Sequence, residues 1–493
     1  MPVRKPLLLP LPLDRAAALP LQRQLYGELR AAILGGRLAA GARLPASRAL
    51  AVELGVSRNT VLGAFDQLLG EGYVEGRHGA GTFVAAMPPD RLLAPARPTA
   101  SSGRPPRAPL LSRRSRELTT AVRERPVGFG AFLPGLPDCS DFPFALWARL
   151  LAKSWRRPAP ALYAGGDRAG HAPLRAAIAD YLRAMRGVAC DAGRIIVVSG
   201  IRQAVDLTAR LVIDPGDAVW VEEPGYFGVR AALAAMGARL VPVPVDGEGC
   251  IVDEAVRLAP DARLACLAPS QQYPLGGALS LSRRLALLDW ARAADAWILE
   301  DDYDSEYRYA GRPLAALQGL DRDGRVVYVG SLSKVMFPSL RLAYLVAPEG
   351  LVDRFLAMRA TIDDHPSAVV QPALAAFIAD GHLAAHVRRM RRRYASRQAA
   401  LLRAAERHLD GLLVLRPAEA GMHLVAELAP AVAKRMDDHE AARRAEAAGV
   451  AVVPLSASYL QAPRRQGLLL GYAAVAEPAI APAVRRLAAA LAG

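Results

Sequence analysis

Two unrelated motif patterns, far apart along the 493 residues, constrain this chain most strongly, because one compact domain does not account for both. Near the N-terminus, residues 55–61 (GVSRNTV) combine a turn glycine, a helix-capping serine and exposed polar positions. Far downstream, residues 330–334 (GSLSK) follow an apolar run and place two hydroxyls beside a lysine. This length suits two or three domains, so we expect a separate N-terminal module and a large body.

The N-terminal module is predicted to span residues 15–86 and to begin with an amphipathic helix. Apolar residues recur every four positions from Leu21 to Ile33, which places them on one face of a helix. The glycine pair 35–36 then ends that helix. Residues 71–84 are predicted to form two short strands around a glycine-rich tip, as in the wing of a winged helix.

A helix-turn-helix pattern lies between these segments. We expect Ser47 to cap a second helix and Ser57 to cap a third, with Gly55 in the tight turn between them. The third helix exposes residues 58–60 on its first turn, where a recognition helix meets base edges and phosphates in the major groove. The pattern therefore predicts binding to double-stranded DNA; the alternative is a helical interaction module with surface arginines.

Positive charge is concentrated in the N-terminal quarter. Residues 1–125 hold 19 lysines and arginines and 9 acidic residues, so they carry +10 of the net +15. Such a segment suits a polyanion, because phosphate contacts release counterions. Residues 87–126, rich in proline, serine and arginine, are predicted to be an extended, mobile linker. Its arginines either follow DNA phosphates or only keep the tether solvated.

The rest of the chain, residues 127–493, alternates short apolar runs with helical stripes, which is typical of an α/β fold. In open α/β sheets, ligands bind at the carboxyl ends of the strands. The chemically distinctive residues of this chain come directly after predicted strands. Those strands lie at residues 194–198, 218–221, 262–267, 296–299 and 326–329.

Three of these strand ends carry complementary chemistry. The first leads into residues 199–201, whose free backbone N–H groups open a helix and make a phosphate site. The fourth ends near Asp301, a carboxylate that can bond a protonated ring nitrogen. The fifth leads into Lys334, a candidate Schiff-base nucleophile. Groups suited to a phosphate accompany this lysine: Ser331, Ser333 and Arg341.

The N-terminal motifs together resemble the winged helix-turn-helix of the GntR family. The matching stretches are residues 44–48, 56–61, 71–72 and 79–84. The resemblance implies DNA contacts from the second helix, the recognition helix and the wing. The expected DNA-binding residues are Arg48, Ser57, Arg58, Asn59, Thr60, Arg77, His78 and Gly79.

The body resembles fold-type I pyridoxal-phosphate aminotransferases, and the whole chain resembles the fused arrangement of MocR-type regulators. The resemblance implies a multidomain protein in which a three-layer α/β/α transferase domain follows the winged helix. It also implies a small C-terminal α+β subdomain over roughly residues 375–493. Such active sites form at a dimer interface, so we expect a head-to-tail homodimer.

The same resemblance assigns roles around pyridoxal 5'-phosphate. Lys334 is expected to hold the cofactor aldehyde, Asp301 to pair with the ring nitrogen, and Tyr303 to bond the phenolic oxygen, with Tyr226 stacked on the ring. Tyr163 would reach the phosphate of the neighbouring subunit. The remaining phosphate ligands implied are Ser199, Gly200, Ile201, Ser331, Ser333 and Arg341.

Two departures from aminotransferases bear on the ligand. Tyr273 stands where they carry an asparagine before Pro-x-Gly, and residues 454–459 lack the arginine that clamps a substrate carboxylate. Arg230, Arg464 and Arg465 are either replacement clamps or ordinary solvated arginines. The missing clamp predicts an effector amine without an α-carboxylate, or the cofactor itself as the signal.

We therefore predict a cytoplasmic transcriptional regulator that senses pyridoxal phosphate, an amine or an amino acid at Lys334. The alternatives are a working aminotransferase that kept a DNA-binding head, and a DNA-binding protein with a dead pocket. Four widely spaced cysteines argue against a disulfide framework or a metal site, and no apolar run is long enough to span a bilayer. The apolar stretch 7–12 is too short and too proline-rich for a signal peptide.

Overall fold

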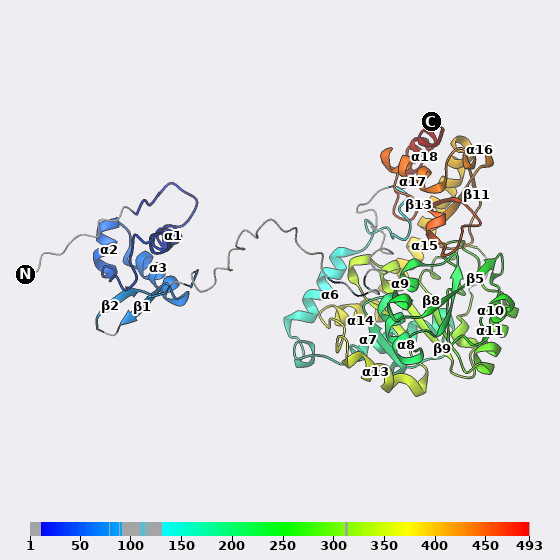
Figure 1. The fold of residues 1–493 in the computed structure, drawn as a ribbon, viewed down its shortest axis with the longest axis horizontal. Coiled ribbons are helices and arrows are strands. Elements are labelled where there is room, and N and C mark those ends of the chain that lie inside the picture. The colour runs from blue at the N-terminus through cyan, green and yellow to red at the C-terminus, as the bar shows by residue number, and fades with distance from the viewer. Residues whose placement is uncertain are drawn as a thin grey trace, which may run out of the picture. The chain divides into compact units, whose positions relative to one another are not determined.

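The computed structural model describes residues 11–77, 79–87, 89–90, 131–310 and 314–492, and the single positions 110, 112 and 115. The chain divides into two units, Met1–Leu110 and Leu111–Gly493 (Figure 1). His78 and most of the predicted linker lie outside the described residues. No helix in these described ranges combines the length and the hydropathy needed to cross a membrane.

The first unit has the predicted three helices followed by a β-hairpin. Its elements are α1 (Leu21–Leu34), α2 (Ser47–Leu54), α3 (Arg58–Gly70), β1 (Val74–Arg77) and β2 (Gly81–Val84). The strands pair antiparallel, with Val74 opposite Val84. The buried faces of the three helices meet in one core with Val74 and Val84, and Leu25, Leu29 and Val61 are fully buried in it. Packing of these faces explains why a short segment folds as a unit.

One of the two predicted helix caps is present and the other is wrong. Ser57 precedes α3, and its hydroxyl accepts a hydrogen bond from the backbone N–H of Thr60 at 3.1 Å. Ser47 is instead the first residue of α2; Ala46 precedes the helix, which has no side-chain cap. Gly55 ends α2 with φ +64°, a left-handed conformation that favours glycine, so the predicted tight turn is correct.

The second unit is built on an eight-stranded sheet with the order β3-β10-β9-β8-β7-β4-β5-β6. All five predicted strands are present. In the order of the sheet, β5, β4, β7, β8 and β9 run parallel to one another, whereas β10 is antiparallel to both β3 and β9. The strands are β3 (Ile195–Val198), β4 (Ala218–Glu223), β5 (Arg239–Asp246), β6 (Gly249–Cys250), β7 (Leu264–Leu267), β8 (Trp297–Asp302), β9 (Val326–Ser331) and β10 (Ala343–Val346).

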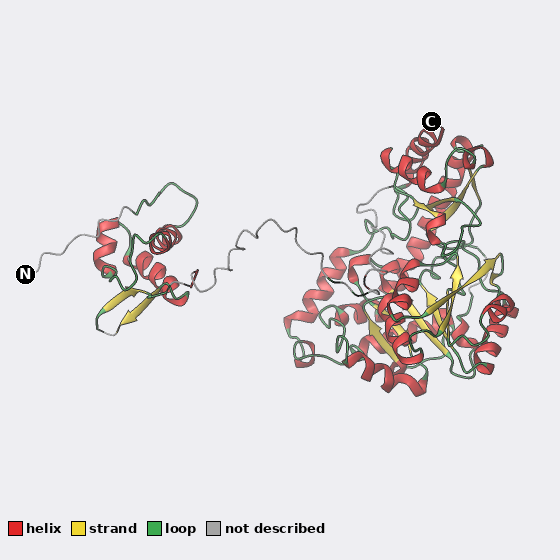
Figure 2. Ribbon diagram, in the orientation of Figure 1, coloured by secondary structure: helices red, strands yellow, loops and turns green. Residues whose placement is uncertain are grey.

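Helices cover both faces of this sheet, which confirms the predicted three-layer architecture (Figure 2). One face packs on α8 (Ile201–Val212), α9 (Phe227–Ala235) and α13 (Val352–Ala360). The opposite face packs on α7 (Ala172–Arg186), α10 (Val252–Leu258), α11 (Leu281–Ala293) and α14 (Gln371–Ala379), with α6 (Phe144–Arg156) against α14. The strands are buried on both faces, as their continuous apolar runs require.

A smaller antiparallel sheet with the order β11-β12-β14-β13 forms the predicted C-terminal α+β part. Its strands are β11 (Leu413–Leu415), β12 (His423–Leu428), β13 (Val453–Pro454) and β14 (Gly467–Gly471). The accompanying helices are α15 (His382–His408), α16 (Pro430–Ala433), α17 (Asp438–Ala447) and α18 (Glu477–Ala492). Helix α15 packs along α18 and links the two sheets (Figure 1).

Candidate functional site

Lys334 lies in the short helix α12 (Leu332–Val335), which directly follows strand β9. Its Nζ donates a hydrogen bond to the carbonyl oxygen of Gly135 at 2.7 Å. A Cβ on Gly135 would stand 2.8 Å from this nitrogen, so glycine is what leaves room for the lysine. The hydroxyl of Tyr307 donates to the Lys334 carbonyl oxygen at 3.2 Å and fixes the turn. The amine is thus positioned at the carboxyl end of the sheet.

Arg341 and the N-terminus of α8 converge on one corner of the site. A Cβ built on Gly200 would lie 3.5 Å from Nη2 of Arg341. Gly200 has φ +147° and provides no side-chain cap for α8, and Arg341 itself adopts φ +50°. A guanidinium beside an uncapped helix N-terminus is an anion site, because both carry positive potential.

Ser199 in this corner is less open than the sequence indicated. Its backbone N–H and its hydroxyl both donate to Oε1 of Gln203, at 2.7 and 3.1 Å. The expectation of a free N–H therefore fails at Ser199, because a side chain one helical turn later occupies it. Ser331 ends β9 and Ser333 lies in α12, both half-buried beside Lys334.

Asp301 and Tyr303 lie at the end of β8, on a strand that is hydrogen-bonded to β9. Burial, and then the charge of Asp302, raise the pKa of Asp301 to about 7, while Lys334 acts to lower it. The buried Tyr303 hydroxyl has no hydrogen-bond partner in the described part of the chain. A buried acid whose ionised form is stabilised by a cation fits the protonated ring nitrogen of pyridoxal phosphate. A buried hydroxyl that lacks a hydrogen-bond partner among the described residues fits its phenolic oxygen.

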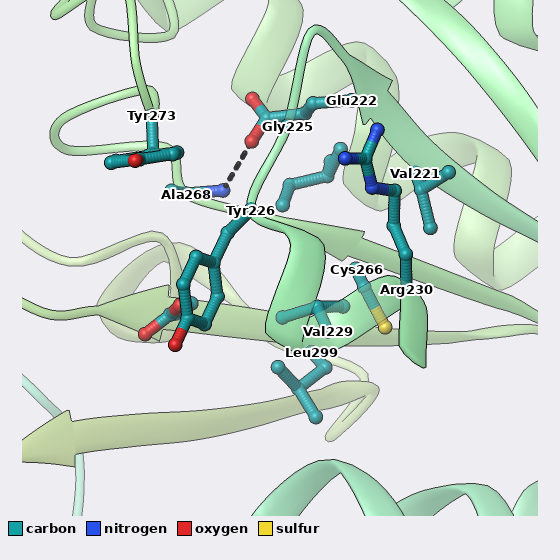
Figure 3. A pocket seen from close by; sticks show the side chains of 12 residues that line it. Val221, Glu222, Gly225, Tyr226, Val229, Arg230, Cys266, Ala268, Tyr273 and Leu299 are labelled. Atoms are coloured by element: carbon teal, nitrogen blue, oxygen red, sulfur yellow. Dashed lines mark hydrogen bonds between the residues drawn. The ribbon is translucent and has the colours of Figure 1, made fainter. Parts of the chain in front are cut away.

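A small cavity of about 30 Å³, near the size of one water, lies next to these groups (Figure 3). Tyr226 reaches it from the start of α9, and a Cβ on Gly228 would clash with the Tyr226 ring at 2.5 Å. The ring of Tyr273 meets that of Tyr226 edge-on, with centroids 5.7 Å apart. Glycine at 228 therefore allows Tyr226 to lie across the helix start and to line this cavity.

Glu222 lines the same cavity and was missed by the sequence analysis. Its carboxylate accepts a hydrogen bond from the backbone N–H of Ala268 at 3.1 Å (Figure 3). Burial raises its pKa to about 8, which favours the protonated form of this carboxyl. The sequence distinguishes Glu222 only by its position at the end of an apolar strand. Glu223 shares this position, so the two could not be told apart.

Arg230 is neither a solvated surface residue nor a free carboxylate clamp. It is buried, and its Nη1 donates to the carbonyl oxygen of Ser458 at 2.8 Å. It also lies 3.7 Å from Glu223, so its charge already has a partner. Of the other two candidates, Arg464 is exposed and Arg465 forms an ion pair with Glu427.

The predicted DNA-reading residues lie on α2, at the start of α3 and on the hairpin. Arg48, Arg58 and Asn59 are exposed, and Thr60 is half-buried beside the Ser57 cap. In the hairpin, Arg77 lies over the ring of Phe83, 4.6 Å from its centroid, and Gly79 makes the turn with φ +72°.

One further basic residue joins the hairpin. Arg43 forms an isolated bridge with Phe83, and a Cβ on Gly81 would lie 3.2 Å from its Nε. No local pattern marked it, because a partner 40 residues away positions it.

Comparisons with known proteins agree with both units. Residues 21–84 match the bacterial regulatory proteins of the gntR family, and residues 156–487 match the aminotransferase class I and II family. The chain is 46% identical over 464 residues to the probable rhizopine catabolism regulatory protein MocR of Rhizobium meliloti, covering 94% of this chain and 92% of that protein. It is 34% identical to the HTH-type transcriptional regulator TauR of Rhodobacter capsulatus, over 96% of each chain.

Solved structures match the second unit. A Pyrococcus horikoshii kynurenine aminotransferase in complex with PMP superposes with a TM-score of 0.68 and 27% identity, over 78% of this chain and 95% of that chain. LysN, the α-aminoadipate aminotransferase of Thermus thermophilus, complexed with N-(5'-phosphopyridoxyl)-L-leucine, gives 0.67 and 28%, over 77% and 95%. The predicted family, fold and cofactor are therefore confirmed. The chain belongs to the MocR-type transcriptional regulators, in which a GntR-family DNA-binding head is joined to an aminotransferase-like, pyridoxal-phosphate-binding body.

Proposed function

We propose that this regulator senses an amine, or pyridoxal phosphate itself, through a cofactor held on Lys334, and that ligand capture changes how the head binds its operator. One observation carries the proposal. A lysine amine, a buried carboxyl, a guanidinium at a helix N-terminus and a buried tyrosine hydroxyl without a partner among the described residues lie along the carboxyl edge of the large sheet. Each suits a different part of the same cofactor.

Different residues would hold different parts of that cofactor. Pyridoxal phosphate supplies an aldehyde for the lysine amine and an electron-withdrawing ring. Arg341 and the N-terminus of α8 would hold its phosphate, Asp301 would keep a proton on its ring nitrogen, and Tyr303 would donate to its phenolic oxygen. Tyr226 would cover one face of the ring and exclude water from it.

The active unit is proposed to be a head-to-tail homodimer. Tyr163 is 65% exposed on the body, although it is a large aromatic residue, and a neighbouring subunit's cofactor phosphate would give it a partner. We place the protein in the cytoplasm, where a bacterial regulator meets its operator DNA. The boundaries 15–86, 87–126 and 127–493 remain our proposal for head, linker and body.

The effector is proposed to lack an α-carboxylate. Arg230 is held by Glu223 and by Ser458, so its guanidinium would have to break two contacts to clamp a carboxylate. A ligand alters the DNA-binding equilibrium only if its affinity differs between the two states of the body. An amine that took the place of Lys334 on the cofactor would provide such a difference, because Lys334 would be released.

Borohydride reduction tests the cofactor assignment. Reduction of the wild-type protein loaded with pyridoxal phosphate should fix the cofactor on Lys334, detected by peptide mass. Lys334→Ala should fix none and keep basal DNA binding, and Lys434→Ala, which changes an exposed lysine, should behave as wild type. Fixation at another lysine would refute the assignment.

Turnover separates the regulator from the alternative, a working aminotransferase. The regulator should react with an amine once per site and then stop. Rapid, repeated conversion of an amino donor and a keto acid would favour the enzyme.

A further inference from the structure

Asp304 is a buried carboxylate for which the proposed function has no use. The residue is fully buried, and neither carboxylate oxygen has a hydrogen-bond partner among the described residues. Burying such a group without a partner is costly, so proteins rarely retain one by chance. Burial accordingly raises the pKa of Asp304 well above its usual range, while the positive charge of Lys334 acts to lower it.

The carboxylate lies near the lysine end of the proposed cofactor site. Asp304 follows Tyr303 in the turn after β8, and Lys334 exerts the strongest electrostatic attraction on it. A Cβ on Gly421, which precedes β12 in the smaller sheet, would lie 3.4 Å from Oδ2 of Asp304 and 2.7 Å from Nε2 of Gln271. Segments from both sheets therefore meet at this carboxylate, and Gly421, with φ +93°, avoids the clash that a side chain would make with Gln271.

Three polar groups around Asp304 have other partners, whereas the buried hydroxyls of its chain neighbours Tyr303 and Ser305 have none among the described residues. Tyr472 donates its hydroxyl to the carbonyl oxygen of Gly421 at 2.7 Å, and the Tyr309 hydroxyl donates to the same oxygen. The side-chain amide of Gln271 donates to the carbonyl oxygen of Ala420 at 3.3 Å. None of these donors is directed at Asp304, so a ligand is the natural source of one.

The nearby arginines are also engaged. Arg308 pairs with Glu419 at 2.7 Å, and Arg186 pairs with Asp302 at 2.8 Å. Lys334 is the neighbouring cation in the cofactor-free protein, and exchange of the cofactor onto an incoming amine would release its nitrogen as an uncharged amine. A second cation from the ligand would then compensate the Asp304 charge.

We infer that Asp304 receives the distal ammonium group of a diamine whose other amino group would replace the Lys334 nitrogen on the cofactor's aldehyde carbon, one C=N bond forming as the other breaks and the lysine leaving as an amine. The inference rests on the proposed function and narrows its effector class. A fully buried carboxylate beside tyrosine rings favours a cation over a neutral group, because a charge-assisted hydrogen bond is about twice as strong as a neutral one. The Asp304 carboxylate would also repel a distal carboxylate, which agrees with the engagement of the candidate clamp Arg230 by Glu223 and Ser458.

A matched ligand series tests this inference on the holoprotein. The ligands 1,4-diaminobutane, butylamine and 4-aminobutanoate share one reactive amine and differ at the distal end. Titrations followed by the visible absorbance of the bound cofactor give an apparent Kd for each. We expect the diamine to bind at least about tenfold more tightly than the other two, the effect of one charge-assisted contact.

Asp304→Asn should bring the three affinities within about threefold of each other, because it removes the charge and keeps the shape. Asp323→Asn, on an exposed loop, should leave the diamine preference intact. The wild-type series decides the question even if Asp304→Asn does not fold, because equal affinities, or tighter 4-aminobutanoate, would overturn the inference.

The two proposals fail in different ways. A protein that takes up the cofactor on Lys334 but shows no diamine preference overturns only the role of Asp304. A protein whose lysine never acquires the cofactor absorbance overturns the proposed function, and this inference with it.

Discussion

Buried acids around the cofactor site should make the stability of the cofactor-free protein depend on pH. Burial raises the pKa of Glu222 to about 8 from a usual 4.5, so the folded state keeps a proton that the unfolded state has lost. The folded state therefore binds more protons between these values, and its stability falls as pH rises from about 4.5 to 8. Burial acts in the same direction on Asp301.

Glu222→Gln should therefore flatten the dependence of Tm on pH over this range, because the amide carries no titratable proton. Thermal unfolding of the cofactor-free wild type and variant at several pH values measures it. A wild-type Tm that rises steadily with pH up to about 8 would show that Glu222 is ionised in the folded protein.

The sequence predicted only part of the candidate site, because the surroundings of the other residues come from segments far away in the chain. Lys334 and Asp301 were found because strand ends mark the ligand edge of an α/β sheet. Asp304 and Arg230 were not understood, because their surroundings come from distant segments. Arg230, for example, bonds to Ser458, 228 residues later. Burial of a charged side chain by such a segment leaves no local pattern in the sequence.

At the scale of the element, the two serines of the helix-turn-helix provide a matched pair. Ser57→Ala should lower the unfolding free energy of the head by about 1 kcal/mol, because it removes the bond to the Thr60 N–H. Ser47→Ala should cost less, because Ser47 is already inside α2 and caps nothing. Urea unfolding followed by circular dichroism measures both. Equal losses would mean that the Ser57 bond is not a stabilising cap.

Strand existence was easier to predict than strand partners. The five apolar runs became strands, but β5, β6 and β10 of the same sheet were missed. Strand β5 carries Pro242 and Pro244, which weaken a strand pattern, and its outer neighbour β6 pairs only with its last two residues. Strand β10 is antiparallel between two strands, and direction cannot be read from an apolar run.

At the scale of the whole molecule, the two units carry separable chemistry. Arg58→Ala should weaken operator binding at every salt concentration and lower the slope of log K against log salt by about one, if Arg58 contacts one phosphate. It should leave the visible absorbance of the cofactor unchanged, because Arg58 belongs to the first unit. Fluorescence anisotropy across a salt series measures the first effect. An unchanged slope would remove Arg58 from the phosphate contacts.

The central claim is that chemistry at Lys334 controls DNA binding by the head. The most direct test compares cofactor-loaded and cofactor-stripped protein on the DNA upstream of its own gene, for wild type and Lys334→Ala, with and without 1,4-diaminobutane. We predict that cofactor or diamine changes the affinity or the footprint of the wild type and changes neither for Lys334→Ala. A wild type that binds identically in every condition, or a variant that still responds, would contradict the claim.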